Sequence, residues 1–385
     1  MKIKQHTSNV DKVWMLFLLL FCIARVYLTY MQVYSTGDRF VSDITEHNIF
    51  AFSGSEYSLY GLILYPIGKF FSFSVMQIWS VIILSISDIF SIIIVKFILT
   101  KYIENRSICN FLSIALFFVS MLIVIGPLLY NSTYLGVGTP NIWHNPTFTL
   151  ARPFSILVFY FTIKITSNIK EKKQLLVNDF ILLSIFALLS CASKPSFLFV
   201  FVPAYAIYLL IYMIRNKFKN FISYLLIAVP FIPCLFVLYI QNSFLFSDNN
   251  ENQILFGYNT LWSDIAPYHS VLYAIVLACI FPLFVFIVDI KKHNAENILC
   301  FLMVLIGIFE IIFFSECGER SLHYNFFWGY YFALFFAFLY SSIQFFMVFK
   351  QRALIIKIIG IILFLAHLIS GLYYFINLCL GDLYY

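Results

Sequence analysis

The feature that most constrains this chain is a succession of apolar runs, each about 20 residues long, separated by short polar segments. Runs of this length cross a bilayer as α-helices, because lipid offers no partner for an unpaired backbone group. Only 11% of the residues are charged and 62% are hydrophobic, which excludes a soluble globular protein. The sequence therefore predicts an all-α, polytopic transmembrane helical bundle that forms one integral membrane domain over residues 1–385.

Basic residues are distributed unevenly among the segments that join these runs. The positive-inside rule places the N-terminal tail, residues 1–12, in the cytoplasm. It also places five basic segments there: residues 101–106, 168–174, 215–220, 291–297 and 350–352. This arrangement requires residues 57–74 to be re-entrant or surface-lying rather than spanning, and it then gives about eleven spans. One predicted span, residues 108–130, leads into the polar segment at residues 131–153.

The opposite, outer side receives five polar segments: residues 35–56, 131–153, 193–196, 242–269 and 315–325. They contain few basic residues, and each of these lies among other polar side chains: Arg39, Arg152, Lys194 and Arg320. The net charge of +6 does not predict nucleic-acid binding, because the basic residues flank apolar runs. The eight cysteines lie mostly inside apolar runs, so no disulfide framework is indicated. We expect a multi-pass protein of the bacterial cytoplasmic membrane, in contact with membrane lipid.

The polar segment from Gly138 to Pro153 contains three prolines, each of which removes a backbone donor and biases the preceding residue away from helix. We expect a stiff, non-helical loop that forms one wall of a site. Its candidate substrate-binding residues are Trp143, His144, Asn145 and Arg152. An ordinary connecting loop with chance polar residues is the alternative interpretation.

The first outer segment holds candidate catalytic residues. Asp43 and His47 are four residues apart, so on a helix they share one face. A carboxylate beside an imidazole suits general-base removal of a hydroxyl proton, or binding of a divalent cation. A solvated surface helix is the alternative, and the sequence does not decide whether any metal is used.

Two further outer segments supply cations. Lys194 stands alone between two apolar runs, whereas Arg320 lies among acidic and imidazole groups. A guanidinium offers a planar fork for a phosphate, and an ammonium offers a point charge. The remaining candidates for substrate binding are Glu319, His323 and Trp328. The tryptophans could stack on sugar rings or belong to the aromatic belt at the membrane interface.

The order of these elements resembles the integral-membrane C-type (GT-C) glycosyltransferases, which have an acidic residue in the first outer loop and about ten further spans. Three elements are also similar to uncharacterised membrane proteins of bacterial surface-polysaccharide clusters: Trp143-His-Asn-Pro-Thr147, Lys194-Pro-Ser196 and the segment from Gly318 to Tyr330. The paired-acid form of the first-loop motif is absent, as is the large soluble C-terminal domain of oligosaccharyl transferases.

The resemblance implies sugar transfer from a polyprenyl-phosphate donor to a glycan or lipid-linked acceptor at the outer face. It implies that Asp43 is the catalytic base, with Asp38 as the second candidate. The donor phosphate would meet Arg320, Lys194 or Arg152.

Two other functions remain open. A repeat-unit polymerase for O-antigen or capsule would use similar donors and outer-loop cations. A lipid-linked glycan flippase or transporter would need a polar path through the bundle. Three ionisable residues inside predicted spans could form such a path, or could be satisfied separately within a packed interior: Asp88, Glu310 and His367.

Overall fold

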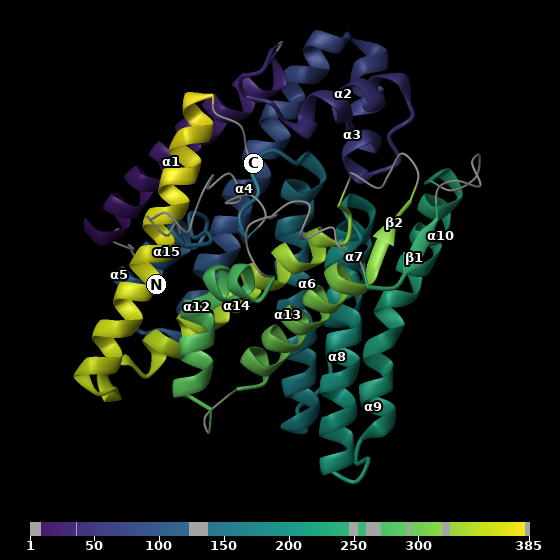
Figure 1. Cartoon of the computed structure of the whole chain (residues 1–385). Helices are drawn as coiled ribbons and strands as arrows, with labels where there is room; N and C mark the ends of the chain where they lie inside the picture. The colour runs from purple at the N-terminus through teal and green to yellow at the C-terminus, as the bar shows by residue number, and fades with distance from the viewer. Residues whose placement is uncertain are drawn as a thin grey trace, which may run out of the picture.

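The computed structural model describes residues 9–35, 37–122, 138–245, 253–258, 271–290, 294–317 and 324–381. Almost all the regular structure in these residues is helical (Figure 1), which confirms the predicted all-α class. In chain order the elements are α1 (Asn9–Val33), α2 (Asp43–Ser53), α3 (Leu59–Phe70), α4 (Phe73–Tyr102), α5 (Arg106–Ala115), α6 (Pro146–Lys170), α7 (Val177–Ser193), α8 (Ser196–Arg215), α9 (Phe221–Leu225), the 3-10 helix η2 (Leu226–Phe231), α10 (Ile232–Leu245), β1 (Ile254–Phe256), α12 (Val271–Val288), α13 (Ala295–Phe313), β2 (Phe314–Glu316), α14 (Phe327–Met347), the 3-10 helix η4 (Phe349–Gln351) and α15 (Leu354–Leu380).

Eight helical segments among the described residues are long and apolar enough to cross a membrane. They are α1, α4, α6, α8, the continuous stretch Phe221–Ser243, α13, α14 and α15. Two further apolar helices, α7 and α12, are shorter. The chain is therefore a multi-pass membrane protein, but the predicted number of about eleven spans is not confirmed.

The predicted span at residues 108–130 is wrong as a continuous helix, because α5 ends at Ala115; residues 123–130 of it lie outside the described residues. Tertiary hydrogen bonds replace helical ones beyond that point. The side-chain amide of Asn141 donates to two backbone carbonyl groups of residues 116–119, both at 2.9 Å. The Ser120 N–H donates to the backbone of α15 at 3.1 Å. Irregular backbone at this depth is tolerated because it is buried in protein and its polar groups are paired.

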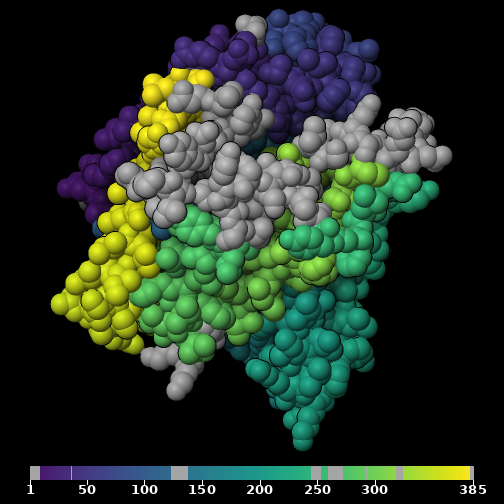
Figure 2. Space-filling model, in the orientation of Figure 1, coloured from purple at the N-terminus to yellow at the C-terminus, as the bar shows by residue number. Residues whose placement is uncertain are grey.

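Residues 57–74 do not form a spanning helix. They contain α3, which has 12 residues and is therefore only about 18 Å long, against about 30 Å for the hydrocarbon core. Helices α2 and α3 pack on one another and cover one end of the molecule (Figures 1 and 2). The basic connection between α8 and α9 lies at the opposite end of the molecule (Figure 1).

Helix α14 is the central helix of the bundle (Figure 1). Its sequence is apolar around its whole circumference, and nearly every residue is buried against α8, α12 and α13. A Cβ at Gly307 of α13 would lie 2.8 Å from the Cα of Tyr330, so the two backbones pack directly on each other. This close packing fixes the first turn of α14, which carries Trp328.

Helix α6 begins at Pro146, so the prediction of a non-helical loop was wrong for residues 146–153. Proline is favoured at the first helical position, because its missing N–H has no helical partner there. The side chain of Asn145 caps the helix by accepting the Phe148 N–H at 2.9 Å. Sequence reasoning took Pro146 to end regular structure, whereas it begins the helix.

The second misread proline, Pro153, lies inside α6. Having no N–H, it leaves the Thr149 carbonyl without a helical donor. The hydroxyl of Ser87, on α4, donates to that carbonyl at 2.8 Å. A neighbouring helix thus satisfies the freed group, and α6 continues through the proline.

Smaller boundary changes affect the tail and two outer segments. Helix α1 already begins at Asn9, inside the predicted tail of residues 1–12. Strands β1 and β2 pair antiparallel, with Leu255 opposite Ser315. They connect the predicted outer segments 242–269 and 315–325 through a two-stranded sheet.

Candidate functional site

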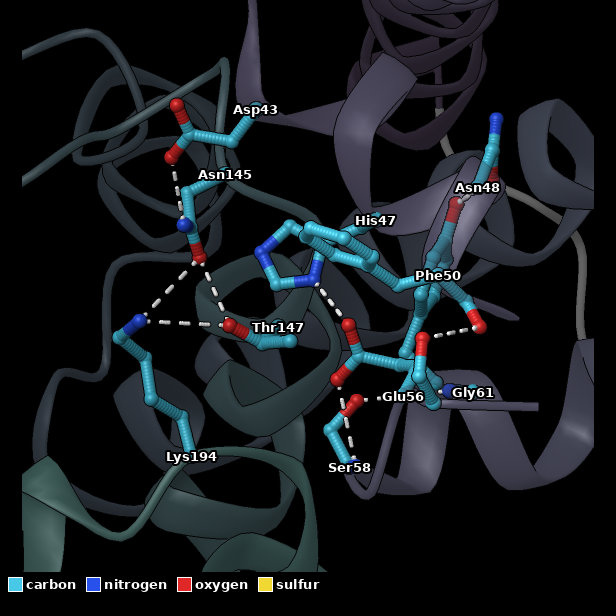
Figure 3. Close-up of polar contacts among 12 residues, drawn as sticks. Asp43, His47, Asn48, Phe50, Glu56, Ser58, Gly61, Asn145, Thr147 and Lys194 are labelled. Carbon is cyan, nitrogen blue, oxygen red and sulfur yellow. Dashed lines mark hydrogen bonds and ion pairs between the residues drawn. The ribbon is translucent and has the colours of Figure 1, made fainter. Parts of the chain in front are cut away.

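A chain of polar contacts joins three segments that are distant in sequence (Figure 3). The amide Nδ2 of Asn145 donates to Oδ2 of Asp43 at 2.7 Å. The ammonium of Lys194 lies 3.5 Å from Oδ1 of the same amide and 3.3 Å from Oγ1 of Thr147. A carboxylate and an ammonium group are therefore linked through one amide. We call these four residues the polar network.

The fold fixes each member of this network. Asp43 is the first residue of α2, and Lys194 lies in the tight connection between α7 and α8. The side-chain oxygen Oδ1 of Asn145 accepts from the Thr147 hydroxyl at 2.9 Å and caps α6. Its NH2 group is thereby turned toward Asp43. The cap that starts α6 also orients the carboxylate.

An aromatic ring supports the ammonium group. Nζ of Lys194 lies 4.1 Å from the ring centroid of Trp328, a cation–π contact. The same indole lies 6.1 Å from the ring of His144 and 5.9 Å from that of Phe148. Trp328 is thus a wall of the site that holds the cation in place.

His144 is a buried member of the site. Burial, assisted by the nearby charges of Lys194 and Arg25 and opposed by Asp43, lowers the pKa of its imidazole to about 4. At neutral pH His144 is therefore neutral, and it adds polarity to the site without adding charge.

A second carboxylate, which sequence analysis did not single out, accompanies His47. Nδ1 of His47 lies 2.6 Å from Oε2 of Glu56, which is in the turn between α2 and α3. Burial acts to raise the pKa of Glu56, but hydrogen bonds from His47 and Ser58 outweigh it and lower this pKa. Glu56 is therefore a carboxylate at neutral pH.

A second set of charges forms a fully buried cluster of three residues on three helices. Nε of Arg25 lies 2.6 Å from Oδ2 of Asp88, and Nη1 of Arg152 lies 3.6 Å from its Oδ1. Each of the three side chains is 1% exposed. We call this set the buried charge cluster. Asp88 is thus paired, as expected for a carboxylate inside a membrane helix.

Two predicted substrate contacts belong to this interior rather than to the polar network. Arg152 lies on α6, not in a loop, and its guanidinium is surrounded by the rings of Phe117, Trp143, Phe148 and Phe335 at 5.1–5.9 Å. Trp143 is 1% exposed, and its carbonyl accepts from Nη1 of Arg25 at 3.2 Å. Because α6 begins at Pro146 and continues through Pro153, Arg152 lies on a helix that packs in the core.

The remaining predicted residues are placed as follows. Asp38 is exposed in the turn between α1 and α2. Glu319, Arg320 and His323 lie outside the described residues. His367 bonds within the bundle, where Nδ1 donates to the Ser120 carbonyl at 2.6 Å. No group of three or more His, Cys, Asp or Glu side chains suited to a metal ion occurs in the described ranges.

Three residues with clear roles were missed: Arg25, Glu56 and Thr147. Arg25 is the one arginine inside the first apolar run, so pairing it with Asp88 of another run was possible from charge alone. Thr147 follows a helix-starting Asn-Pro pair, a signal for a first-turn hydroxyl. No local pattern connects Glu56 to His47.

A comparison with protein-family models and a comparison with curated proteins each find no match to this chain.

Proposed function

We propose that this protein is a membrane glycosyltransferase that uses a polyprenyl-phosphate-linked sugar at the outer face of the bacterial cytoplasmic membrane, in surface-polysaccharide assembly. One observation carries the proposal: a carboxylate, Asp43, and an ammonium, Lys194, are bridged by the Asn145 amide beside the start of a membrane helix. Sugar transfer from a lipid phosphate needs a base for the acceptor and a cation for the leaving group.

In the proposed reaction, the acceptor hydroxyl oxygen attacks the anomeric carbon of the donor sugar. The bond from that carbon to the phosphate oxygen breaks, and polyprenyl phosphate leaves with the electron pair. Asp43 takes the hydroxyl proton. Its Oδ2 is held by Asn145, so the carboxylate is oriented before substrate binds.

The leaving phosphate gains negative charge as the bond breaks, and the site offers several groups to stabilise it. Lys194 supplies a positive charge, and Thr147 adds a hydroxyl in the first turn of α6. The N-terminus of a helix favours an anion, since its first N–H groups point outward. His144, neutral because it is buried, contributes polarity without competing for the base.

The first experiment deletes the protein from its host and identifies the lipid-linked glycan that accumulates. The proposal expects a glycan that lacks one sugar. An intact but unpolymerised repeat unit would identify a polymerase instead. A complete lipid-linked glycan trapped on the cytoplasmic side would identify a flippase.

The second experiment returns variants to the deletion strain. Asp43→Asn keeps the size and polarity of the side chain but cannot take the proton, so glycan formation should fall by roughly 10²–10⁴-fold. Glu46→Gln is the matched control: it removes one negative charge from the same helical turn, at an exposed position. Normal glycan from well-expressed Asp43→Asn would contradict the assignment, and loss with Asp38→Asn alone would move the base to Asp38.

A further inference from the structure

The pairing of His47 with Glu56 is built into the local structure. Oε1 of Glu56 accepts the Ser58 N–H at 3.2 Å, and the Ser58 hydroxyl caps α3 by accepting the Gly61 N–H. A Cβ at Gly61 would lie 2.2 Å from Cγ of Glu56, so glycine is needed for the carboxylate to lie here. Glu56 is therefore held on both sides by the start of α3.

This carboxylate determines which nitrogen of His47 carries the proton. Glu56 is ionised and can only accept, so Nδ1 of His47 donates to it over 2.6 Å. In the neutral ring, Nε2 is then an unprotonated acceptor. In Figure 3 the ring lies between Glu56 and the polar network, with Nε2 turned toward the side of Asn145.

His47 also lies one helical turn after Asp43, on the same face of α2. Its side chain is 24% exposed, so it has access to water that the interior groups lack. One side of the site thus carries three groups in succession: the Asp43 carboxylate, the His47 imidazole with its acceptor nitrogen, and the Glu56 carboxylate.

We propose that His47 is a second catalytic residue, which removes the acceptor proton from Asp43 after sugar transfer, and that Glu56 is its positioning residue. This inference rests on the proposed function. The proton that Asp43 has taken from the acceptor passes to Nε2 of His47, which regenerates the carboxylate. The imidazolium keeps its Nδ1–H bond to Glu56 and then releases the Nε2 proton to water, so the cycle closes without a net change in either residue.

The test uses purified full-length protein in lipid nanodiscs, with the lipid-linked glycan fraction extracted from the deletion strain as substrate. His47→Gln should slow turnover at saturating substrate by about 100-fold, the lower end of the range for a proton-transfer residue. Glu56→Gln should cause a smaller loss. Neither should change the substrate concentration for half-maximal rate, because neither group holds the donor. Glu46→Gln on the same helix should behave as wild type.

Chemical rescue separates catalysis from a merely structural role. His47→Ala leaves space for a ring, so added imidazole should restore turnover. Pyrazole, which has a similar shape but is a much weaker base, should not. Equal rescue by both compounds, or a well-folded His47→Ala protein that imidazole leaves slow, would overturn the proton-transfer role.

The remaining outcomes distinguish the two proposals. Loss of turnover in Asp43→Asn with normal turnover in His47→Gln would reject the His47 role and leave the proposed function intact. Normal turnover in both variants would reject the proposed function itself.

Discussion

The polar network and the buried charge cluster have similar ingredients in different surroundings. Each contains an aspartate and at least one cationic group, and each includes a contact with the segment around Asn145. In the buried charge cluster, Asp88 contacts two guanidinium groups and all three side chains are 1% exposed. In the polar network, Asp43 and Lys194 are only half buried, and an amide separates them.

This difference in burial separates two uses of charge. Charges removed from water are costly unless paired, so the buried charge cluster constrains which helices can pack together. The charged groups of the polar network, Asp43 and Lys194, keep partial contact with solvent. A substrate that approaches from solvent can reach half-buried groups of this kind, whereas Asp88 is enclosed with two cationic neighbours.

The largest expected effect comes from making the same substitution in both regions. Asp88→Asn leaves Arg25 and Arg152 without a counter-charge, which should destabilise the protein by roughly 3–5 kcal/mol. Asp43→Asn should change stability little but abolish most glycan formation. The measurements are thermal unfolding in detergent and glycan formation in the deletion strain.

The distinction between the two regions would be wrong if Asp88→Asn reduced only glycan formation and Asp43→Asn reduced only stability. An Asp88→Asn protein that unfolds like wild type would show that the buried charge cluster does not hold the bundle together. The exposed Glu46→Gln change sets the baseline, since surface substitutions usually lie within about 0.5 kcal/mol of neutral.

His144 lies between the two regions, because Asp43, Lys194 and Arg25 all act on it electrostatically. Its pKa is lowered by burial from 6.5 to about 4, so the unfolded chain binds the proton more tightly than the folded protein. The stability from neutral His144 is present above about pH 6.5 and is lost as the pH falls toward 4, up to roughly 3 kcal/mol. Thermal unfolding at several pH values should show this slope.

The control for this prediction is His144→Gln, which removes the titrating group. As the pH falls from neutral to about 4.5, the free energy of unfolding should decrease more for wild type than for the variant. A difference that stays constant with pH would show that His144 is not buried in its neutral form.

The smallest of the expected effects separates the two roles of Asn145. Asn145→Ala removes both the cap of α6 and the bond to Asp43, at a cost of about 0.5–2 kcal/mol for the cap. Asn145→Ser can still cap the helix but cannot reach Asp43 with an NH2 group. We therefore expect Ser to restore the melting temperature but not glycan formation. Full activity of Asn145→Ser would show that orientation of Asp43 by the amide is unimportant.

The sequence was sufficient to name three members of the polar network, and it also named Asp88 and Arg152 without joining them to Arg25 in the buried charge cluster. Lys194 stands out because the predicted outer segments contain few basic residues, and Asp43 stands out because His47 follows four residues later. Asn145 stands out because it lies in a polar segment between two apolar runs. The bond between Asp43 and Asn145 depends on packing between α2 and α6, which has no local signature.

The misread regions share one physical cause, namely hydrogen bonds between distant segments. Pro153 signals a helix end unless another helix supplies a donor, as Ser87 does. The apolar run after Ala115 signals a span unless other segments pair with its backbone, as Asn141 does. Each donor lies in a different segment from the carbonyl groups that it pairs, so the local sequence does not predict it.

The pair formed by Arg25 and Asp88 has a consequence for biosynthesis. Arg25 lies on α1, which is synthesised before α4, and its partner is 63 residues later in the chain. Until α4 is inserted, the guanidinium has no counter-charge within the membrane, a position that costs about 2.5–3.5 kcal/mol on insertion scales. Arrival of α4 removes most of that cost and joins the two helices before α6 exists, so the chain assembles this part of its interior in the order in which it is synthesised.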